Sequence, residues 1–170
     1  NFEPRHSASL AWSFSKAGFR APQLYDALAL SCASRLNDFD AKQISTLAWA
    51  YARAGRLDRE PLRTALVQQV NERCEQRSFS AQSLANVAWS FAKPEHNAAR
   101  CEDVLDGVAA ASLELGLDQF TDQGLANLAW SCARTPRRGS KAEELVASVT
   151  QAASDRMHEF GPQACANLLW

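Results

Sequence analysis

Several features that mark particular classes of protein are missing from this chain of 170 residues. No apolar run approaches the roughly 18 residues of a membrane-spanning helix, so we expect no segment that crosses a bilayer. Neither sign of charge predominates, because 18 Lys and Arg residues face 19 Asp and Glu residues, for a net charge of -1. This balance excludes a broadly basic surface that would bind nucleic acid strongly and non-specifically, but it is compatible with a localised basic stripe.

The residues that build metal sites, disulfides and catalytic centres are also too few or too scattered. The five cysteines are odd in number and form no C-x-x-C pair, and the three histidines lie far apart. We therefore expect no zinc site, no disulfide framework and no cofactor. The motifs G-x-S-x-G and H-E-x-x-H, a Walker loop and a dinucleotide fingerprint are absent as well. We predict that the chain is not an enzyme and assign no catalytic residue.

What the chain does have is a repeat marked by aromatic residues. Its five tryptophans are separated by 37, 40, 41 and 40 residues, and a phenylalanine lies ten residues before each of them. The text between the two aromatic residues recurs, most clearly as FSAQSLANVAW at 79–89 and FTDQGLANLAW at 120–130. Self-similarity of this length predicts a repeat array. The predicted units are 2–38, 39–78, 79–119 and 120–159, with a partial unit at 160–170, and we expect this single array to be a fragment of a longer one.

Each unit has the pattern of two helices. The first helix is expected to begin after the Phe, at a capping residue such as Asp40, Ser80 or Thr121. It is expected to end near a glycine or proline, namely Gly18, Gly55, Pro94 or Pro136. The second helix carries apolar residues four positions apart, which indicates one buried face. Two such rows are Leu62, Leu66, Val70 and Cys74, and Leu145, Val149, Ala153 and Met157. We predict an all-α fold, a right-handed α-solenoid of tandem two-helix repeats of about 37–41 residues.

A polar stripe follows the first helix of each unit. With the Phe counted as position zero, the apolar positions +5, +8, +9 and +12 share one helix face. Positions +3, +7 and +14 lie within about 40° of one another on the opposite face. Position +3 is occupied by Arg5, Lys42, Gln82, Gln123 and Gln163. Position +7 is occupied by Ser9, Thr46, Asn86, Asn127 and Asn167. Position +14 is occupied by Lys16, Arg53, Lys93 and Arg134, and the tryptophan at +10 borders the stripe.

If the first helices stack side by side, the stripe becomes a ladder that suits single-stranded RNA. Lys and Arg can neutralise phosphates, Ser, Thr and Asn can bond to base edges, and aromatic rings can stack on bases. We therefore predict that the residues at +3, +7 and +14 bind RNA. Two alternatives stay open. The stripe can be a solvated helix face, with the +14 cations complementing the helix dipole, or the +7 side chains can form buried hydrogen bonds between units.

The segments Leu84–Lys93 and Leu125–Arg134 follow the motif L-A-N-x-A-W-[SA]-[FY]-A-[KR], except that Cys132 replaces the aromatic residue in the second. This motif resembles the octotricopeptide and heptatricopeptide repeats, which are related to repeats of RAP-domain and FAST-kinase proteins. The resemblance implies a location in a chloroplast or mitochondrion and binding to single-stranded RNA or rRNA in RNA processing, stability, translation or ribosome assembly. The alternative is a scaffold subunit that binds protein within a ribosome, photosynthetic complex or respiratory complex, because solenoids offer long surfaces to proteins as well.

Overall fold

The structure, a computed structural model, describes residues 3–93, 101–134 and 140–169, and the side chains up to residue 166 within these ranges. Every regular element in them is helical. The α-helices are α1 (Pro4–Ala17), α2 (Pro22–Ala33), α3 (Ala41–Arg53), α4 (Leu62–Glu75), α5 (Ala81–Ala92), α6 (Glu102–Leu115), α7 (Asp122–Ala133), α8 (Lys141–Asp155) and α9 (Pro162–Leu169). Short 3-10 helices are η1 (Leu36–Asp38), η3 (Leu117–Gln119) and η4 (Met157–Glu159). The prediction of an all-α fold is confirmed for the described residues.

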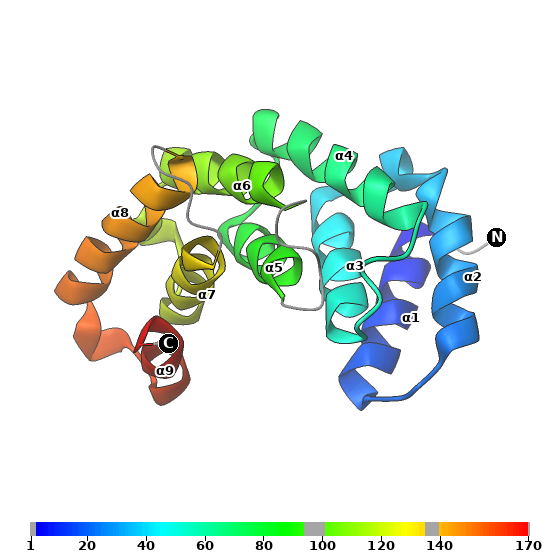
Figure 1. The fold of residues 1–170 in the computed structure, drawn as a ribbon, viewed down its shortest axis with the longest axis horizontal. Helices are drawn as coiled ribbons and strands as arrows, with labels where there is room; N and C mark the ends of the chain where they lie inside the picture. The colour runs from blue at the N-terminus through cyan, green and yellow to red at the C-terminus, as the bar shows by residue number, and fades with distance from the viewer. Residues whose placement is uncertain (1–2, 94–100, 135–139, 170) are drawn as a thin grey trace.

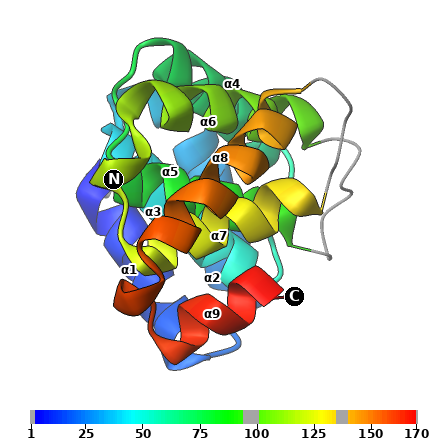
Figure 2. The same ribbon diagram turned by 90° about the vertical axis from the view of Figure 1, so that its left-hand side faces the viewer.

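The helices pack in two rows. In the first row α1, α3, α5, α7 and α9 each contact the next, and in the second row α2, α4, α6 and α8 do the same. The two rows form an arc, with the even-numbered helices along its outer side and the odd-numbered helices along its inner side (Figure 1). In the view turned by 90°, α4 and α6 lie above α3, α5 and α7, and α8 lies above α7 (Figure 2). Helices that begin at the recurring Phe therefore lie beside one another, as the stripe requires.

The predicted start signals act as N-caps in three of the odd-numbered helices. The Asp40 carboxylate accepts the backbone N–H of Gln43 at 2.7 Å, and the Gln43 side chain accepts the N–H of Asp40 at 3.1 Å, which completes a capping box. Ser80 and Thr121 cap α5 and α7 in the same position. These bonds satisfy N–H groups that the first turn of a helix leaves without partners. The register of each helix is thus set just after its Phe.

The predicted stop signals are described for two of these helices. Gly18 and Gly55 follow α1 and α3 with φ of 68° and 67°, the left-handed conformation that glycine adopts without steric cost. Pro94 and Pro136 lie outside the described residues.

One continuous apolar core lies between the two rows. The predicted row on α4 is buried along its whole length, from Leu62 to Cys74. The row on α8 is correct for Leu145, Val149 and Ala153 but wrong for Met157, which is half exposed. The reason is that α8 ends at Asp155, so Met157 belongs to η4 and no longer follows the helical period.

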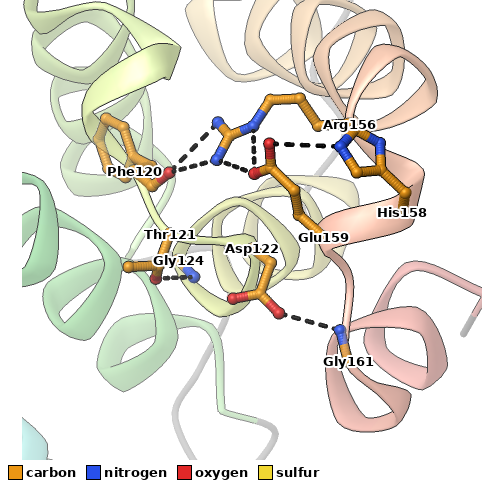
Figure 3. A network of polar contacts seen from close by, with 8 residues as sticks. All are labelled: Phe120, Thr121, Asp122, Gly124, Arg156, His158, Glu159 and Gly161. Atoms are coloured by element: carbon orange, nitrogen blue, oxygen red, sulfur yellow. Dashed lines mark hydrogen bonds and ion pairs between the residues drawn. The ribbon is translucent and has the colours of Figure 1, made fainter.

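Polar bonds between backbone and side chains also join successive units. The Asp106 carboxylate on α6 accepts the N–H of Ala142 on α8 at 3.0 Å. At the end of the chain the Asp122 carboxylate accepts the N–H of Gly161 at 3.1 Å, and the Arg156 guanidinium donates to the Phe120 carbonyl at 3.4 Å (Figure 3). The bonds to Ala142 and Gly161 satisfy backbone N–H groups at the start of α8 and directly before α9.

Candidate functional site

Much of the predicted stripe lines an open groove on the odd-numbered helices. One groove segment, of about 720 Å³, crosses α1, α3 and α5, and a second, of about 350 Å³, crosses α5 and α7. Gln82 and Asn86 line both segments, so the two lie next to each other. We call them together the polar groove. The predicted residues that line it are Ser9, Thr46, Asn86 and Asn127 at +7, Lys42, Gln82 and Gln123 at +3, and Lys16 at +14.

Other predicted residues do not line these two segments. Arg5 forms an exposed ion pair with Glu3 at 2.9 Å. Gln163 is exposed on α9, and Arg53, Lys93 and Arg134 lie beyond the groove lining. The side chain of Asn167 lies outside the described residues.

The +7 side chains are accessible from the groove. Ser9 is exposed, whereas Thr46, Asn86 and Asn127 are half-buried. The Thr46 hydroxyl donates to the Lys42 carbonyl of its own helix at 2.7 Å, and the Gln123 amide donates to the Asn127 side-chain oxygen at 2.9 Å. For Ser9, Thr46 and Asn86, the described part of the chain shows no side-chain hydrogen bond to another unit. Beside them, the Ser45 hydroxyl of one unit donates to the Ser83 hydroxyl of the next at 3.2 Å.

Each +14 cation lies over the tryptophan of its own unit. The distances from the charged group to the ring centroid are 5.7 Å for Lys16–Trp12, 5.4 Å for Arg53–Trp49, 5.2 Å for Lys93–Trp89 and 5.0 Å for Arg134–Trp130. All four distances fall within the range of a cation–π interaction. The spacing from +10 to +14 is one helical turn, which brings the two side chains to the same face.

Two of these cations also bond to the preceding unit. Arg53 Nε donates to the Ser15 carbonyl at 3.2 Å, and Lys93 Nζ donates to the Ala52 carbonyl at 3.3 Å. Both acceptors lie in the last turn of a neighbouring helix, where carbonyls have no partner within the helix. In the structure, position +14 therefore holds the tryptophan ring and joins consecutive helices, and of the four cations only Lys16 lines the polar groove.

Two of the tryptophans contribute to the polar groove. Trp12 and Trp49 line it, and Trp12 is 41% exposed. The rings of Trp49 and Trp89 lie 6.1 Å apart with an interplanar angle of 31°. Trp89 and Trp130 are half-buried and pack against the core. The aromatic surface open to a ligand is therefore concentrated towards α1 and α3.

The charge of the groove lining differs from that of the whole chain. Among the residues that the structure describes, no aspartate or glutamate lines either segment, although the whole sequence contains 19 acidic residues. Its charged side chains are Lys16 and Lys42, both exposed and both at the end near α1 and α3. Towards α7 the lining consists of amides and hydroxyls. Such a surface offers cations, hydrogen-bond donors and ring faces without a repelling carboxylate.

Sequence reasoning missed four hydroxyl residues that line the groove. Ser80 and Thr121 at +1 are also the N-caps of α5 and α7, and Ser45 and Ser83 form the bond between units. The capping signal was visible in the sequence, but the position of the caps at the groove depends on how the helices align.

The described residues contain no group of three or more His, Cys, Asp or Glu side chains that could hold a metal ion. All five cysteines have free thiols, and burial raises the pKa of Cys74 and Cys132 to about 12. None of the described helices combines the length and the apolar character needed to cross a bilayer.

Comparison with protein-family models finds no model that matches this chain, and comparison with curated proteins finds no significant match.

Proposed function

We propose that this chain is a right-handed α-solenoid of helical repeats that binds single-stranded RNA along the polar groove. The observation that carries the proposal is the pair of adjoining groove segments across α1, α3, α5 and α7, with hydroxyls, amides, cations and indole rings in their lining and no carboxylate among the described residues. A basic peptide would favour an acidic lining, whereas a phosphodiester strand favours this one.

The two ends of the groove would contact different parts of the RNA. Lys16 and Lys42 would neutralise phosphates near α1 and α3, where the exposed ring of Trp12 could stack on a base. Gln82 and Asn86 would bond to base edges, because an amide offers both a donor and an acceptor. The described residues show no hydrogen bond to the Asn86 side chain, so its full capacity is open to a ligand. The order of these groups gives the groove a direction.

The resemblance to organellar repeat proteins extends the proposal to RNA processing, stability, translation or ribosome assembly in a chloroplast or mitochondrion. It rests on the motif around Leu84–Lys93 and Leu125–Arg134. All of these roles depend on the binding of RNA along the polar groove.

A fluorescence-anisotropy titration with a labelled single-stranded RNA pool, at several salt concentrations, tests the proposal. Lys16→Ala with Lys42→Ala should weaken binding to all sequences. It should also reduce the slope of log affinity against log salt by about 1.4, since each phosphate contact contributes about 0.7. Gln82→Ala with Asn86→Ala should instead erase the preference among sequences and lower affinity for the preferred RNA about tenfold, with the salt slope unchanged.

Matched control variants place the same changes outside the polar groove. Arg77→Ala with Lys141→Ala removes two exposed cations, and Gln68→Ala with Gln151→Ala removes two exposed amides. Both controls should bind RNA as the unchanged chain does. If the groove variants bind RNA normally but lose a protein partner from the same assembly, the chain is a scaffold subunit and the proposal is wrong.

A further inference from the structure

A second cavity, separate from the polar groove, lies at the carboxyl ends of α1 and α3. Its volume is about 550 Å³, and its charged lining residues are Arg20, Arg53 and Arg56. Phe14, Phe19 and Pro22 form an apolar wall beside them. We call it the arginine cavity. We propose that it binds a nucleotide, with the phosphate held by the arginines and the base against the ring of Phe19. This site goes beyond the proposed function, because none of its lining residues lines the polar groove.

The arginines leave positive charge in the cavity. Arg20 is exposed and forms no ion pair with any described residue. Arg56 is mostly buried and its Nη2 lies 3.4 Å from the Asp26 carboxylate, but its Nε is buried without a hydrogen-bond partner among the described residues. Asp26 is half exposed, lies outside the cavity lining and is shared with Arg59 at 3.9 Å. Arg20 therefore offers its guanidinium to a phosphate in the cavity, and Arg53 and Arg56 add positive charge beside it.

The helix ends at the cavity do not cancel this charge. Carbonyl groups at a helix C-terminus would normally repel an anion. Here the chain itself covers them: the N–H groups of Gly18 and Phe19 donate to the last turn of α1, at 3.2 and 3.1 Å. The N–H groups of Gly55 and Arg56 do the same for α3, at 3.1 and 2.8 Å. These turns, together with the bond from Arg53 to Ser15, use the carbonyls internally.

The apolar wall favours a nucleotide over a bare anion. The side chain of Phe19 is 68% exposed, which is unfavourable because the phenyl ring is apolar. The ring lies edge-on to Phe14, with 6.0 Å between the ring centroids. A base stacked on Phe19 would cover apolar surface that water now contacts. Inorganic phosphate would use only the arginines and would leave the ring of Phe19 uncovered.

The arginine cavity also borders the polar groove through one side chain. Arg53 lines the cavity, and its guanidinium lies over Trp49, which lines the groove. A strand in the groove could therefore place one nucleotide in the cavity, and a free mononucleotide could bind there alone. The shared ligand is a phosphate attached to a nucleoside.

Isothermal titration calorimetry of the whole chain at low salt, with adenosine 5'-monophosphate, adenosine and inorganic phosphate as separate probes, tests the proposal. The monophosphate should bind more tightly than either part alone. Arg20→Ala should weaken the monophosphate and phosphate about tenfold. Phe19→Ala should weaken the monophosphate and adenosine about tenfold but leave phosphate unchanged. Both side chains are exposed, so neither change removes core packing.

Arg77→Ala and Leu30→Ala are the matched controls, an exposed cation and an exposed apolar side chain outside the cavity. Both should bind all three probes normally. The proposal is overturned if the monophosphate does not bind, if it binds no more tightly than phosphate, or if Arg20→Ala leaves it unaffected. Gln82→Ala with Asn86→Ala should leave monophosphate binding intact. Failure at the cavity with RNA binding retained in the groove would refute this inference alone, and the opposite result would refute the proposed function alone.

Discussion

Burial distinguishes the reactivity of the cysteine residues. The thiols of Cys32, Cys74, Cys101 and Cys132 are buried, and burial raises the pKa of each, to about 12 for Cys74 and Cys132. Cys165 is half-buried at the start of α9. Since the thiolate is the reactive form, at pH 8 about one molecule in ten thousand would carry it at Cys74 or Cys132. Burial also blocks access of the reagent.

We therefore expect iodoacetamide at pH 8 to label Cys165 first in the folded protein. Cys165→Ser should remove the rapid labelling, and denaturant should make the remaining thiols reactive. Peptide mass spectrometry after timed quenching reads each site separately. Rapid labelling of Cys132 in the folded chain would contradict the buried environment described for it.

The cations at +14 show how far single residues can be predicted from the sequence. Their fixed spacing from the tryptophan follows from the helical period, so the pairing with the ring could have been predicted. The bonds from Arg53 and Lys93 to carbonyls of the preceding helix could not, because they depend on the separation of two helices. The same is true of the arginine cavity, which combines residues from two units.

At the scale of helices, the junction between α7 and α9 depends on the Asp122 carboxylate. It accepts the N–H of Gly161, and this bond holds the pKa of Asp122 below its ordinary value of 3.8 (Figure 3). A carboxyl group whose pKa is lower in the folded state than in the unfolded chain stabilises the folded state. This stabilisation is fully present at pH values above the pKa of the unfolded chain. The stabilisation is lost as the pH falls and the group becomes protonated.

Asp122→Ala should therefore lower the melting temperature at pH 7 and reduce its decline between pH 5 and pH 3. The cause is the loss of an acceptor that is stronger when ionised than when protonated. Thermal unfolding followed by circular dichroism measures both effects. Asp58→Ala, at an exposed aspartate, is the control and should preserve the acid dependence. An unchanged pH profile in Asp122→Ala would show that the bond to Gly161 contributes nothing to stability.

The short 3-10 helices were not predicted from the sequence. η1, η3 and η4 each end directly before a recurring Phe. Three residues are too few to show a hydrophobic period, so these turns carry no periodic signal. The N-caps at Asp40, Ser80 and Thr121 were predictable because their side chains have a specific local role.

Across the whole molecule, each helix contacts chiefly its neighbours within and between the two rows. Leu84 on α5 is buried at the centre of the array, and Leu145 on α8 is buried near its end. Leu84→Ala and Leu145→Ala should each cost about 2–5 kcal/mol of unfolding free energy, because each leaves a cavity. Where units contact only neighbours, a change at the end loosens mainly that end.

Amide hydrogen exchange tests this difference. Leu145→Ala should speed exchange mainly in α8, α9 and the helices they contact, whereas Leu84→Ala should speed it on both sides of α5. Leu30→Ala, at an exposed position, should change unfolding free energy by less than about 0.5 kcal/mol. Equal acceleration in α1 and α8 after Leu145→Ala would be inconsistent with coupling between neighbours only.

The repeat period predicted the order of the helices and the residues on each buried face. It predicted less about the candidate site, since the groove depends on the side-by-side alignment of α1, α3, α5 and α7. Residues at +3 and +7 could be placed on a common face from helical geometry alone. Which of them share one groove with the caps Ser80 and Thr121 follows only from packing in three dimensions.

The regular placement of tryptophan gives the protein an optical property. One indole occurs at the same position in each unit, and each of the first four lies beneath a cation. Chains that keep a single indole, with phenylalanine at the others, would carry a fluorophore at one known step of the array. A set of such chains would form a spectroscopic ruler, on which the emission of each member reports how far a bound strand extends.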